Sequence, residues 1–382
     1  MRIIAAPDSF KEAISAADAA RAIAAGCRRA APDVDVDTCP VADGGEGTVN
    51  ALVTATAGRL RHTTVAGPLN DPVRATWGRL GQVVGQPSTA VIELAAASGL
   101  PLVPVARRNP AHATTYGTGQ LIKAALDAGA ERIILGIGGS ATNDGGAGAA
   151  QALGVGFIDD TGSAITQPLT AAHLPTIARI DLSTRDPRLR DTKLVVACDV
   201  TNPLLGADGA AAVYGPQKGA TPAQIPELDR ALAHLADLIE RDVGLDVRHT
   251  PGAGAAGGMG AAALALLGGK LERGVELVLE AVDFHRRVAA AELCITGEGK
   301  LDGQSLSGKA VAGVTRAAAR HHVPTVALVG AVGEHPEALK ALGLESWHVL
   351  APDLPAAESI RRTGELLEAG AYELVRRHLA RR

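Results

Sequence analysis

Residues 131–150 read ERIILGIGGSATNDGGAGAA. A run of branched apolar side chains passes into a polar, glycine-rich loop, and an alanine-rich helical pattern follows. This order of strand, loop and helix is typical of α/β proteins, whose ligands bind beyond the carboxyl ends of the parallel strands. We predict a strand over 131–139 and a helix near 145–153.

The same alternation continues in both directions along the chain. Further strands are predicted at 2–7, 34–42, 193–200, 291–297 and 325–330, and further helices at 15–30, 47–57, 117–128, 225–243 and 309–321. Ser15 and Asp18 provide a capping box for the first helix. Residues 61–94 instead show extended segments and turn residues, which indicate a β-rich entry into a second domain. We predict an α/β fold with a largely parallel sheet, in two units of which the first is interrupted by the second.

Composition excludes several classes of function. A chain of 382 residues suggests two domains, and with only 2% aromatic residues its cores must consist of Ala, Val, Leu and Ile. A net charge of −4 offers no basic surface for nucleic acid. The four cysteines form no C-x-x-C pair, and the uncharged run 250–269 contains seven glycines. We expect a soluble, cytoplasmic protein with no membrane or nucleic-acid partner.

Polar, glycine-rich loops follow five of the predicted strands: PDSFKEA (7–13), ADGGEGT (42–48), GGSATNDGG (138–146), CDVTNPLLG (198–206) and TGEGKLDGQSLSGK (296–309). The chain has only eight lysines, and four lie in these loops or in YGPQKGAT (214–221): Lys11, Lys218, Lys300 and Lys309. In a chain that otherwise uses Arg, these lysines indicate ammonium groups beside phosphate. The alternative is that they are ordinary surface lysines.

Five aspartates accompany the lysines: Asp8, Asp43, Asp144, Asp199 and Asp302. Carboxylates repel phosphate unless a divalent cation lies between them, and Mg²⁺ binds one or two carboxylates together with phosphate oxygens. The mixture therefore suggests handling of a magnesium nucleotide, with one Asp acting as a base. In the alternative interpretation, each Asp only caps a turn or a helix.

Two phosphate-binding motifs compete with this interpretation. The segment GIGGSA (136–141) matches a dinucleotide fingerprint, with Asp159 and Asp160 about twenty residues further on, and it would suggest an NAD(P)-dependent oxidoreductase. Against it, the next helix is predicted to begin near Gly145, outside the motif. Residues 303–309 match GxxxxGK, but Ala310 replaces the required hydroxyl and TGEGKLD separates the match from its strand, so a P-loop is excluded. A non-catalytic nucleotide-binding regulator remains a third alternative.

A wider resemblance spans nearly the whole chain. It rests on the segments APDSFKEAISA, PVADGGEGT, VIELAAASGL, NPAHATTYGTGQLI, GIGGSATNDGGAGAAQALG, ACDVTNPLLG, YGPQKGAT, GAGAAGGMGAA and ITGEGKLDGQSLSGKA. With these motifs in this order, the chain resembles the type I glycerate kinase family, in its bacterial glycerate 2-kinase group. Departures are mild: the family often has Arg at the position of Lys300 and Thr near Ser305.

The resemblance implies a discontinuous Rossmann- or flavodoxin-like domain (1–65 and 288–382) and an inserted α/β domain (66–287), with the active site in the cleft between them. It implies phosphorylation of D-glycerate with ATP and Mg²⁺, usually to 2-phosphoglycerate. The enzyme would serve glycerate metabolism in the cytoplasm as a monomer or homodimer.

Loop position and residue chemistry then suggest individual roles. The predicted catalytic residues are Asp199 or Asp144 as the base, with Lys11 and Lys300. The predicted magnesium ligands are Asp43, Glu46 and Asp302. The predicted substrate- or nucleotide-binding residues are Asp8, Ser9, Ser140, Asn143, Asn202, Lys218, Gly297, Glu298, Gly299, Ser305, Ser307 and Lys309.

Overall fold

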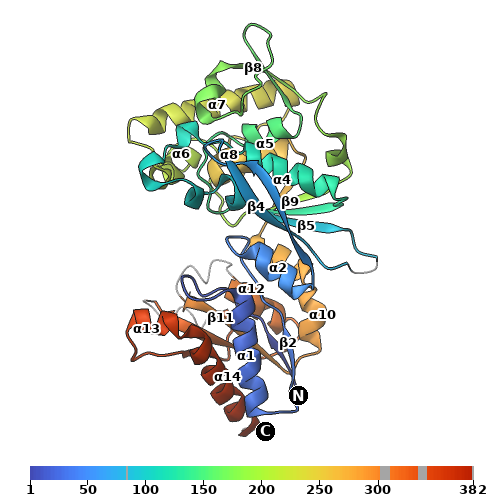
Figure 1. Cartoon of the computed structure of the whole chain (residues 1–382), viewed down its shortest axis with the longest axis vertical. Helices are drawn as coiled ribbons and strands as arrows, with labels where there is room; N and C mark the ends of the chain where they lie inside the picture. Colours follow the sequence, from blue (N-terminus) through green and yellow to red (C-terminus); the bar gives the residue numbers. More distant parts are fainter. Residues whose placement is uncertain (83–84, 302–309, 334–341, 381–382) are drawn as a thin grey trace. The chain divides into compact units, whose positions relative to one another are not determined.

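The computed structural model describes residues 1–82, 85–301, 310–333 and 342–380. They form two compact units, which we describe separately (Figure 1). The terminal unit comprises residues 1–43, 50–58 and 275–382, and the central unit comprises 44–49 and 59–274. Relative to the predicted domain bounds, residues 44–49 and 59–65 fall in the central unit and 275–287 in the terminal unit. The domain assignment itself stays a prediction.

The terminal unit is built on a parallel sheet of five strands in the order β13-β12-β11-β1-β2. Its strands are β1 (Arg2–Ala5), β2 (Asp35–Thr38), β11 (Leu293–Leu301), β12 (Thr325–Val332) and β13 (Ser346–Val349). Its helices are α1 (Ala16–Ala30), α10 (Phe284–Ala289), α12 (Ala310–Ala319), α13 (Ala356–Arg361) and α14 (Thr363–Ala380), and α2 (Thr48–Ala55) and α9 (Gly274–Ala281) lie at its borders with the central unit.

The sheet of the terminal unit is buried on both faces. Side chains alternate along a strand, so Val326 and Leu328 of β12 join one core with α1 and α14, whereas Ala327 and Val329 join another with α12. Strands buried on both sides must be almost continuously apolar, which is the pattern that the sequence shows.

Helices α1 and α14 lie side by side on one face of this sheet (Figure 1). Ser15 caps α1 as predicted, because its side chain accepts a hydrogen bond from the Asp18 amide (3.1 Å). The Asp18 carboxylate accepts from the Ser15 hydroxyl (2.6 Å), so the structure shows the N-cap bond of the predicted capping box. The helices pack tightly at Gly26, where an added Cβ would lie 2.1 Å from the carbonyl oxygen of Glu368 and 2.9 Å from the Cβ of Ala371.

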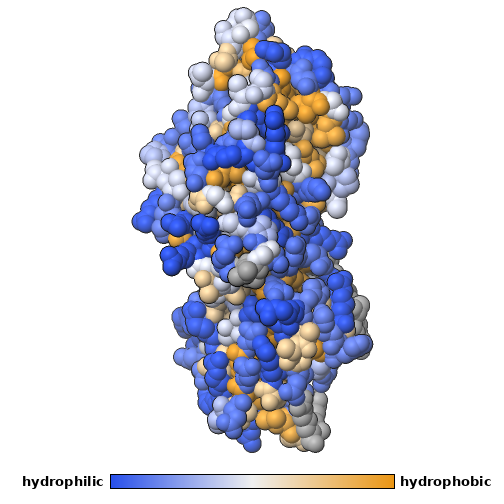
Figure 2. Space-filling model, turned by 90° about the vertical axis from the view of Figure 1, so that its right-hand side faces the viewer, coloured by the Kyte–Doolittle hydropathy of each residue, from blue (hydrophilic) through white to orange (hydrophobic). Residues whose placement is uncertain are grey.

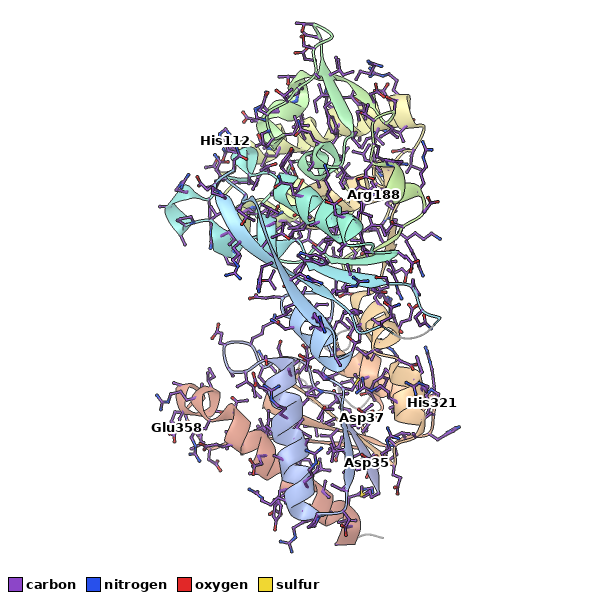
Figure 3. All side chains as sticks on the ribbon, turned by 45° about the vertical axis from the view of Figure 1, so that its right-hand side comes forward. Asp35, Asp37, His112, Arg188, His321 and Glu358 are labelled. Atoms are coloured by element: carbon purple, nitrogen blue, oxygen red, sulfur yellow. The ribbon has the colours of Figure 1, made fainter. Side chains whose placement is uncertain are left out.

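An ion pair joins β2 to α10. Asp35 and Asp37 both lie on β2 (Figure 3). The carboxylate of Asp37 accepts hydrogen bonds from the Arg287 guanidinium at 2.5 and 3.0 Å. Arg287 also donates to the carbonyl oxygen of Thr38 (2.8 Å), so one side chain fixes the end of the strand to the helix.

The central unit is built on a six-stranded sheet in the order β10-β9-β6-β5-β4-β3. Its strands are β3 (Arg59–Ala66), β4 (Pro72–Arg79), β5 (Thr89–Glu93), β6 (Arg132–Gly136), β9 (Lys193–Ala197) and β10 (Lys270–Glu272), and a separate hairpin pairs β7 (Gly156–Asp159) with β8 (Ile177–Asp181). Its helices are α3 (Ala95–Ser98), α4 (Tyr116–Asp127), α5 (Ala147–Ala152), α6 (Ala210–Tyr214), α7 (Gln224–Val243) and α8 (Ala255–Ala265). Six short 3₁₀ turns complete the described part: η1 (Leu100–Leu102), η2 (Val105–Arg107), η3 (Pro110–His112), η4 (Ala171–Thr176), η5 (Pro187–Arg190) and η6 (Pro216–Lys218).

In this sheet β5, β6, β9 and β10 are parallel, whereas β3 and β4 pair antiparallel at one edge. The predicted α/β class and the β-rich stretch after residue 61 are therefore confirmed. The largest core consists mainly of Ala, Val, Leu and Ile, as the composition requires, with Trp77 and Phe157 as its aromatic members.

Several predicted strand ends were wrong. The strands β1, β2, β6 and β9 end at Ala5, Thr38, Gly136 and Ala197, before the predicted residues 7, 42, 139 and 200. Two other strands are longer than predicted. Strand β11 does not end at residue 297 but continues to Leu301, and β12 continues past residue 330 to Val332. The two strands remain paired up to Leu301 and Val332. Gly297 and Gly299 belong to the predicted loop of residues 296–309, but both lie in β11, where a Cβ on Gly297 would lie 2.2 Å from the carbonyl oxygen of Leu328. Tertiary pairing overrides the local turn preference of glycine.

Hydrophilic residues cover most of the face seen in Figure 2, and its apolar areas are broken into separate patches. Among the described residues, no helix combines the length and the apolar character that crossing a membrane requires.

We expect Gly26→Ala to lower the free energy of unfolding by about 1–3 kcal/mol, because its methyl group would force α1 away from α14. Urea unfolding followed by circular dichroism measures the change. Gly364→Ala in α14 is the matched control, since its Cβ would meet nothing within 4 Å. It should be neutral or stabilising by up to about 1 kcal/mol. Equal stability of the two variants would contradict the packing described here.

Candidate active site

Three carboxylates meet at the carboxyl edge of the terminal sheet. The loop after β1 is fixed there by backbone hydrogen bonds from Ala6 to Ile295 (2.8 Å) and from Asp8 to Gly297 (2.8 Å). Glu298 is buried on β11, and Asp43 follows β2. Asp43 and Glu298, both predicted site residues, are thus close enough to raise the pKa of Asp8.

The Asp8 carboxyl group has an unusually high pKa. Its pKa is raised from 3.8 to about 7, chiefly by burial and next by repulsion from Asp43, with a smaller contribution from Glu298. The hydrogen bonds from Ser9 oppose the shift. The Ser9 amide donates one of these bonds, to Asp8 Oδ1 at 2.6 Å. Carboxylates held together in this way favour a nearby cation, which would relieve their repulsion.

Two predicted lysines lie near this edge. Lys11 is exposed in the loop after β1, and Lys300 is exposed near the end of β11. Gly299 lies against this loop, since a Cβ on it would lie 3.6 Å from the Lys11 amide nitrogen and from Phe10 Cα. The backbone thus brings both lysine-bearing segments to the same sheet edge as the three carboxylates.

Four predicted residues lie outside the described part of the chain: Asp302, Ser305, Ser307 and Lys309. Among the described residues, no group of three or more His, Cys, Asp or Glu side chains is arranged to hold a metal ion.

The central unit has its own polar edge, the loop of residues 137–146 after β6. Asp144 in this loop is fully buried. Its Oδ2 accepts hydrogen bonds from the Thr115 amide (2.8 Å), the Thr115 hydroxyl (2.7 Å) and the Gly148 amide (3.3 Å), and its Oδ1 accepts one from Gly146 (3.2 Å). Burial raises the pKa of Asp144 against the effect of these donors. The carboxylate therefore ties the start of α4 to the start of α5.

Lys218 is buried as well. Its ammonium donates to the carbonyl oxygen of Thr142 at 2.7 Å. Burial lowers the pKa of Lys218 to about 7, while attraction to Asp144 opposes the shift. The sequence predicted a ligand-binding lysine, with an ordinary surface lysine as the alternative. The structure places Lys218 inside the unit, where it holds the loop.

Asp199 lies just beyond β9, the strand that pairs with β6. It is exposed, and its Oδ1 accepts a hydrogen bond from the Gly274 amide (2.9 Å). Asn202, in contrast, uses its amide within its own loop: it accepts from the Tyr214 hydroxyl (2.6 Å) and donates to the carbonyl oxygen of Asp208 (2.8 Å).

The ADGGEGT loop packs on this edge through its glycines. Gly44, at φ +90°, lies against Ala197 and Gly274, because a Cβ there would come within 2.7 and 3.0 Å of them. Glu46 is exposed in the same loop.

Sequence reasoning missed two residues of the central edge. Glu93, at the end of β5, accepts a hydrogen bond from the Val49 amide (2.8 Å), and burial raises its pKa. The sequence did contain an indication of this residue, because Glu93 is an acid that directly follows the apolar run TAVI. Thr115 is the second, and nothing in its local sequence indicates its bonds to Asp144.

The dinucleotide fingerprint at 136–141 lacks its structural context. Helix α5 begins at Ala147, so no helix opens within the motif. Asp159 accepts hydrogen bonds from Thr161 and Ser163 in a local turn. This acid therefore closes a turn of the hairpin.

Asp8→Asn tests the electrostatics of the terminal edge. Between about pH 4 and 7 native Asp8 holds a proton that the unfolded chain has lost, so its contribution to stability is lost as the pH rises through about 7. Asp8→Asn carries a neutral side chain at both pH values. Its Tm minus that of wild type should therefore be larger at pH 8 than at pH 5, when both proteins are measured without ligands. Asp33→Asn, at an exposed position, is the control and should show no such change. A pH-independent Tm difference for Asp8→Asn would contradict the effect.

Comparison with known proteins gives a consistent result along the whole chain. The model of the glycerate kinase family matches residues 3–379. A glycerate kinase of Bacillus subtilis (strain 168) is 50% identical over 375 residues, which cover 98% of this chain and 97% of that protein. A glycerate 2-kinase of Escherichia coli (strain K12) is 48% identical over 346 residues, covering 91% and 89%. A crystal structure from Salmonella typhimurium LT2, of a protein provisionally named glycerate kinase 2, has a TM-score of 0.90 at 46% identity and covers 100% of this chain and 98% of its own. This chain therefore belongs to the glycerate kinase family.

Proposed function

We propose that this protein transfers the terminal phosphoryl group of ATP to a hydroxyl group of D-glycerate, forming 2-phosphoglycerate. The observation that carries the proposal is the match to glycerate kinases along essentially the full chain. The two polar sheet edges support it, because their acids and lysines are the groups that phosphoryl transfer requires. Action in the cytoplasm, as a monomer or homodimer, stays a prediction.

The terminal edge suits a magnesium nucleotide. Carboxylate oxygens are the ligands that Mg²⁺ prefers, and it commonly binds one or two of them together with phosphate oxygens and water. Asp43, with Asp8 and Glu298 beside it, would hold the ion directly or through water. Bound Mg²⁺ would neutralise phosphate charge. Glu46 and Asp302 stay predicted ligands.

Cationic side chains would complete the phosphate contacts. Lys11 and Lys300 are exposed and reach solvent from the edge that carries the carboxylates. With Lys309, they would bind phosphate oxygens or the carboxylate of glycerate through charge-assisted hydrogen bonds. Ser9, Ser305 and Ser307 and the amides of Gly297 and Gly299 would add hydrogen-bond donors.

The central edge suits the acceptor, and Asp199 is the better of its two candidate bases. Asp144 already accepts four hydrogen bonds from its own unit, so both of its carboxylate oxygens are occupied. Asp199 is exposed beyond a neighbouring strand end, where it could take the proton of the attacking hydroxyl group. Ser140 and Asn143 lie in the adjacent loop and would bind substrate oxygens. We assign Asp144, Lys218 and Asn202 to positioning these loops.

An oxidoreductase using GIGGSA has no supporting feature, since the helix that should receive the pyrophosphate begins only at Ala147. A non-catalytic regulator would not require an exposed carboxylate at the position of Asp199.

A coupled assay of ADP release tests the proposal. Release should require both D-glycerate and Mg²⁺, should stop when EDTA is added, and should yield 2-phosphoglycerate by ³¹P NMR. Absence of ADP release across a panel of small hydroxy acids would overturn the kinase assignment. A 3-phosphoglycerate product would correct its regiochemistry.

Two isosteric variants separate the candidate bases. Asp199→Asn should fold normally, because an amide oxygen still accepts from Gly274, and should lose about 10²–10⁴-fold in kcat. Asp144→Asn should instead lose about 1–3 kcal/mol of stability, because its NH₂ group must face buried donors. Urea unfolding and steady-state kinetics measure both. Turnover of Asp199→Asn at the wild-type rate would remove it from the role of base.

A further inference from the structure

Asn143 is a buried polar side chain whose hydrogen bonds are not made. It is fully buried, yet neither its amide nitrogen nor its amide oxygen has a hydrogen-bond partner within the described part of the chain. The buried hydroxyl group of Thr142, the preceding residue, also lacks a hydrogen-bond partner among the described residues. Most buried polar groups in folded proteins are paired, so such a side chain needs an explanation.

The backbone before Asn143 is held in place. Lys218 donates to the carbonyl oxygen of Thr142 at 2.7 Å. The amide of Ala141 donates to the carbonyl oxygen of Ser98 (2.9 Å), and the amide of Leu100 donates to that of Gly139 (2.8 Å). The loop therefore cannot easily turn to give Asn143 a partner.

The backbone after Asn143 is held as firmly. Asp144 is bonded to the first turns of two helices, and the Gly145 amide donates to the carbonyl oxygen of Gly257 (2.9 Å). Gly257 has a φ of +69°, and a Cβ there would lie 2.0 Å from the Thr142 carbonyl oxygen and 2.7 Å from Asn143 Cα. Helix α8 bends out of helical geometry over residues 256–258 and packs directly on the loop.

A rigidly held amide with unmatched atoms is the arrangement of a preorganised binding group. Its nitrogen donates and its oxygen accepts, so a matching ligand must offer both an acceptor and a donor. Ionised carboxylate and phosphate groups only accept, whereas a hydroxyl group does both. A hydroxyl group of a ligand can therefore match both atoms of the amide, whereas an ionised carboxylate or phosphate can match only its nitrogen.

We propose that Asn143 is the residue that determines specificity for the acceptor, by binding the hydroxyl group of the hydroxy acid that is not phosphorylated. This inference rests on the proposed function. The ribose of ATP also carries hydroxyl groups, but Asn143 follows β6, whose neighbour β9 leads to Asp199, the proposed base for the acceptor. Asn143 thus belongs to the acceptor side of the reaction.

Asn143→Leu, of nearly equal volume, tests the inference. In isothermal titration calorimetry, wild type should bind D-glycerate about 10²-fold or more tightly than D-lactate, which lacks the 3-hydroxyl group. In Asn143→Leu the affinity for D-glycerate should fall to that for D-lactate, while the affinity for ATP with Mg²⁺ stays within about twofold. The Tm without ligands should be unchanged or higher, because an unmatched buried amide has been removed.

Thr118→Val is the matched control in the same unit. Its buried hydroxyl group is paired, donating to the Ser98 hydroxyl at 2.9 Å, so its removal should lower Tm and leave D-glycerate binding unchanged. A clear loss of Tm in Asn143→Leu with D-glycerate affinity retained would show that Asn143 is structural and overturn the inference. A loss of ATP affinity alone would overturn it too.

Measurements on wild type distinguish a failure of this inference from a failure of the proposed function. Binding of D-glycerate without ADP release would overturn the kinase reaction alone, and the loss of binding in Asn143→Leu would still support the inference. No binding of D-glycerate to wild type would overturn both.

Discussion

Parallel pairing of β1 with β11 is the constraint on which the terminal unit depends. It places Ile3 beside Leu293, and thereby brings the loop after the first strand to a segment almost three hundred residues later. Because parallel strands end at one edge, Asp8 and Glu298 become neighbours without any local sequence relationship. Burial is the main cause of the raised pKa of Asp8, and repulsion from Asp43 and Glu298 adds to it; a bound cation would reduce that repulsion.

In the central unit, buried polar groups hold the ligand-binding loop after β6 in place. Asp144 and Lys218 are more deeply buried than their residue types usually are, and each is bonded to the backbone of the loop or of the elements next to it. Such bonds fix a loop more exactly than apolar packing, which tolerates small displacements. The unmatched amide of Asn143 between them is consistent with a site that sacrifices some stability for recognition.

Local pattern was sufficient for most of the fold and for the position of the ligand-binding loops. A strand near 131–139, observed as the shorter β6 (Arg132–Gly136), the helix capped by Ser15 and the extended stretch after residue 61 were predictable, because each depends on the period of apolar residues and on turn chemistry. The length of β11 was not predictable, because Gly297 and Gly299 favour a turn locally and are held in a strand only by their pairing with β12.

The α/β class, the family and the loops that carry acids and lysines follow from the linear chain, since composition, periodicity and motif order are all properties of it. What each of these residues can do depends on the folded structure. Whether an aspartate is an exposed base, as proposed for Asp199, or a buried tie, as in Asp144, depends on solvent access and hydrogen-bond partners that distant segments supply. Thr115, Gly257 and Glu93 acquired their contacts in the same way, from segments that only folding brings together.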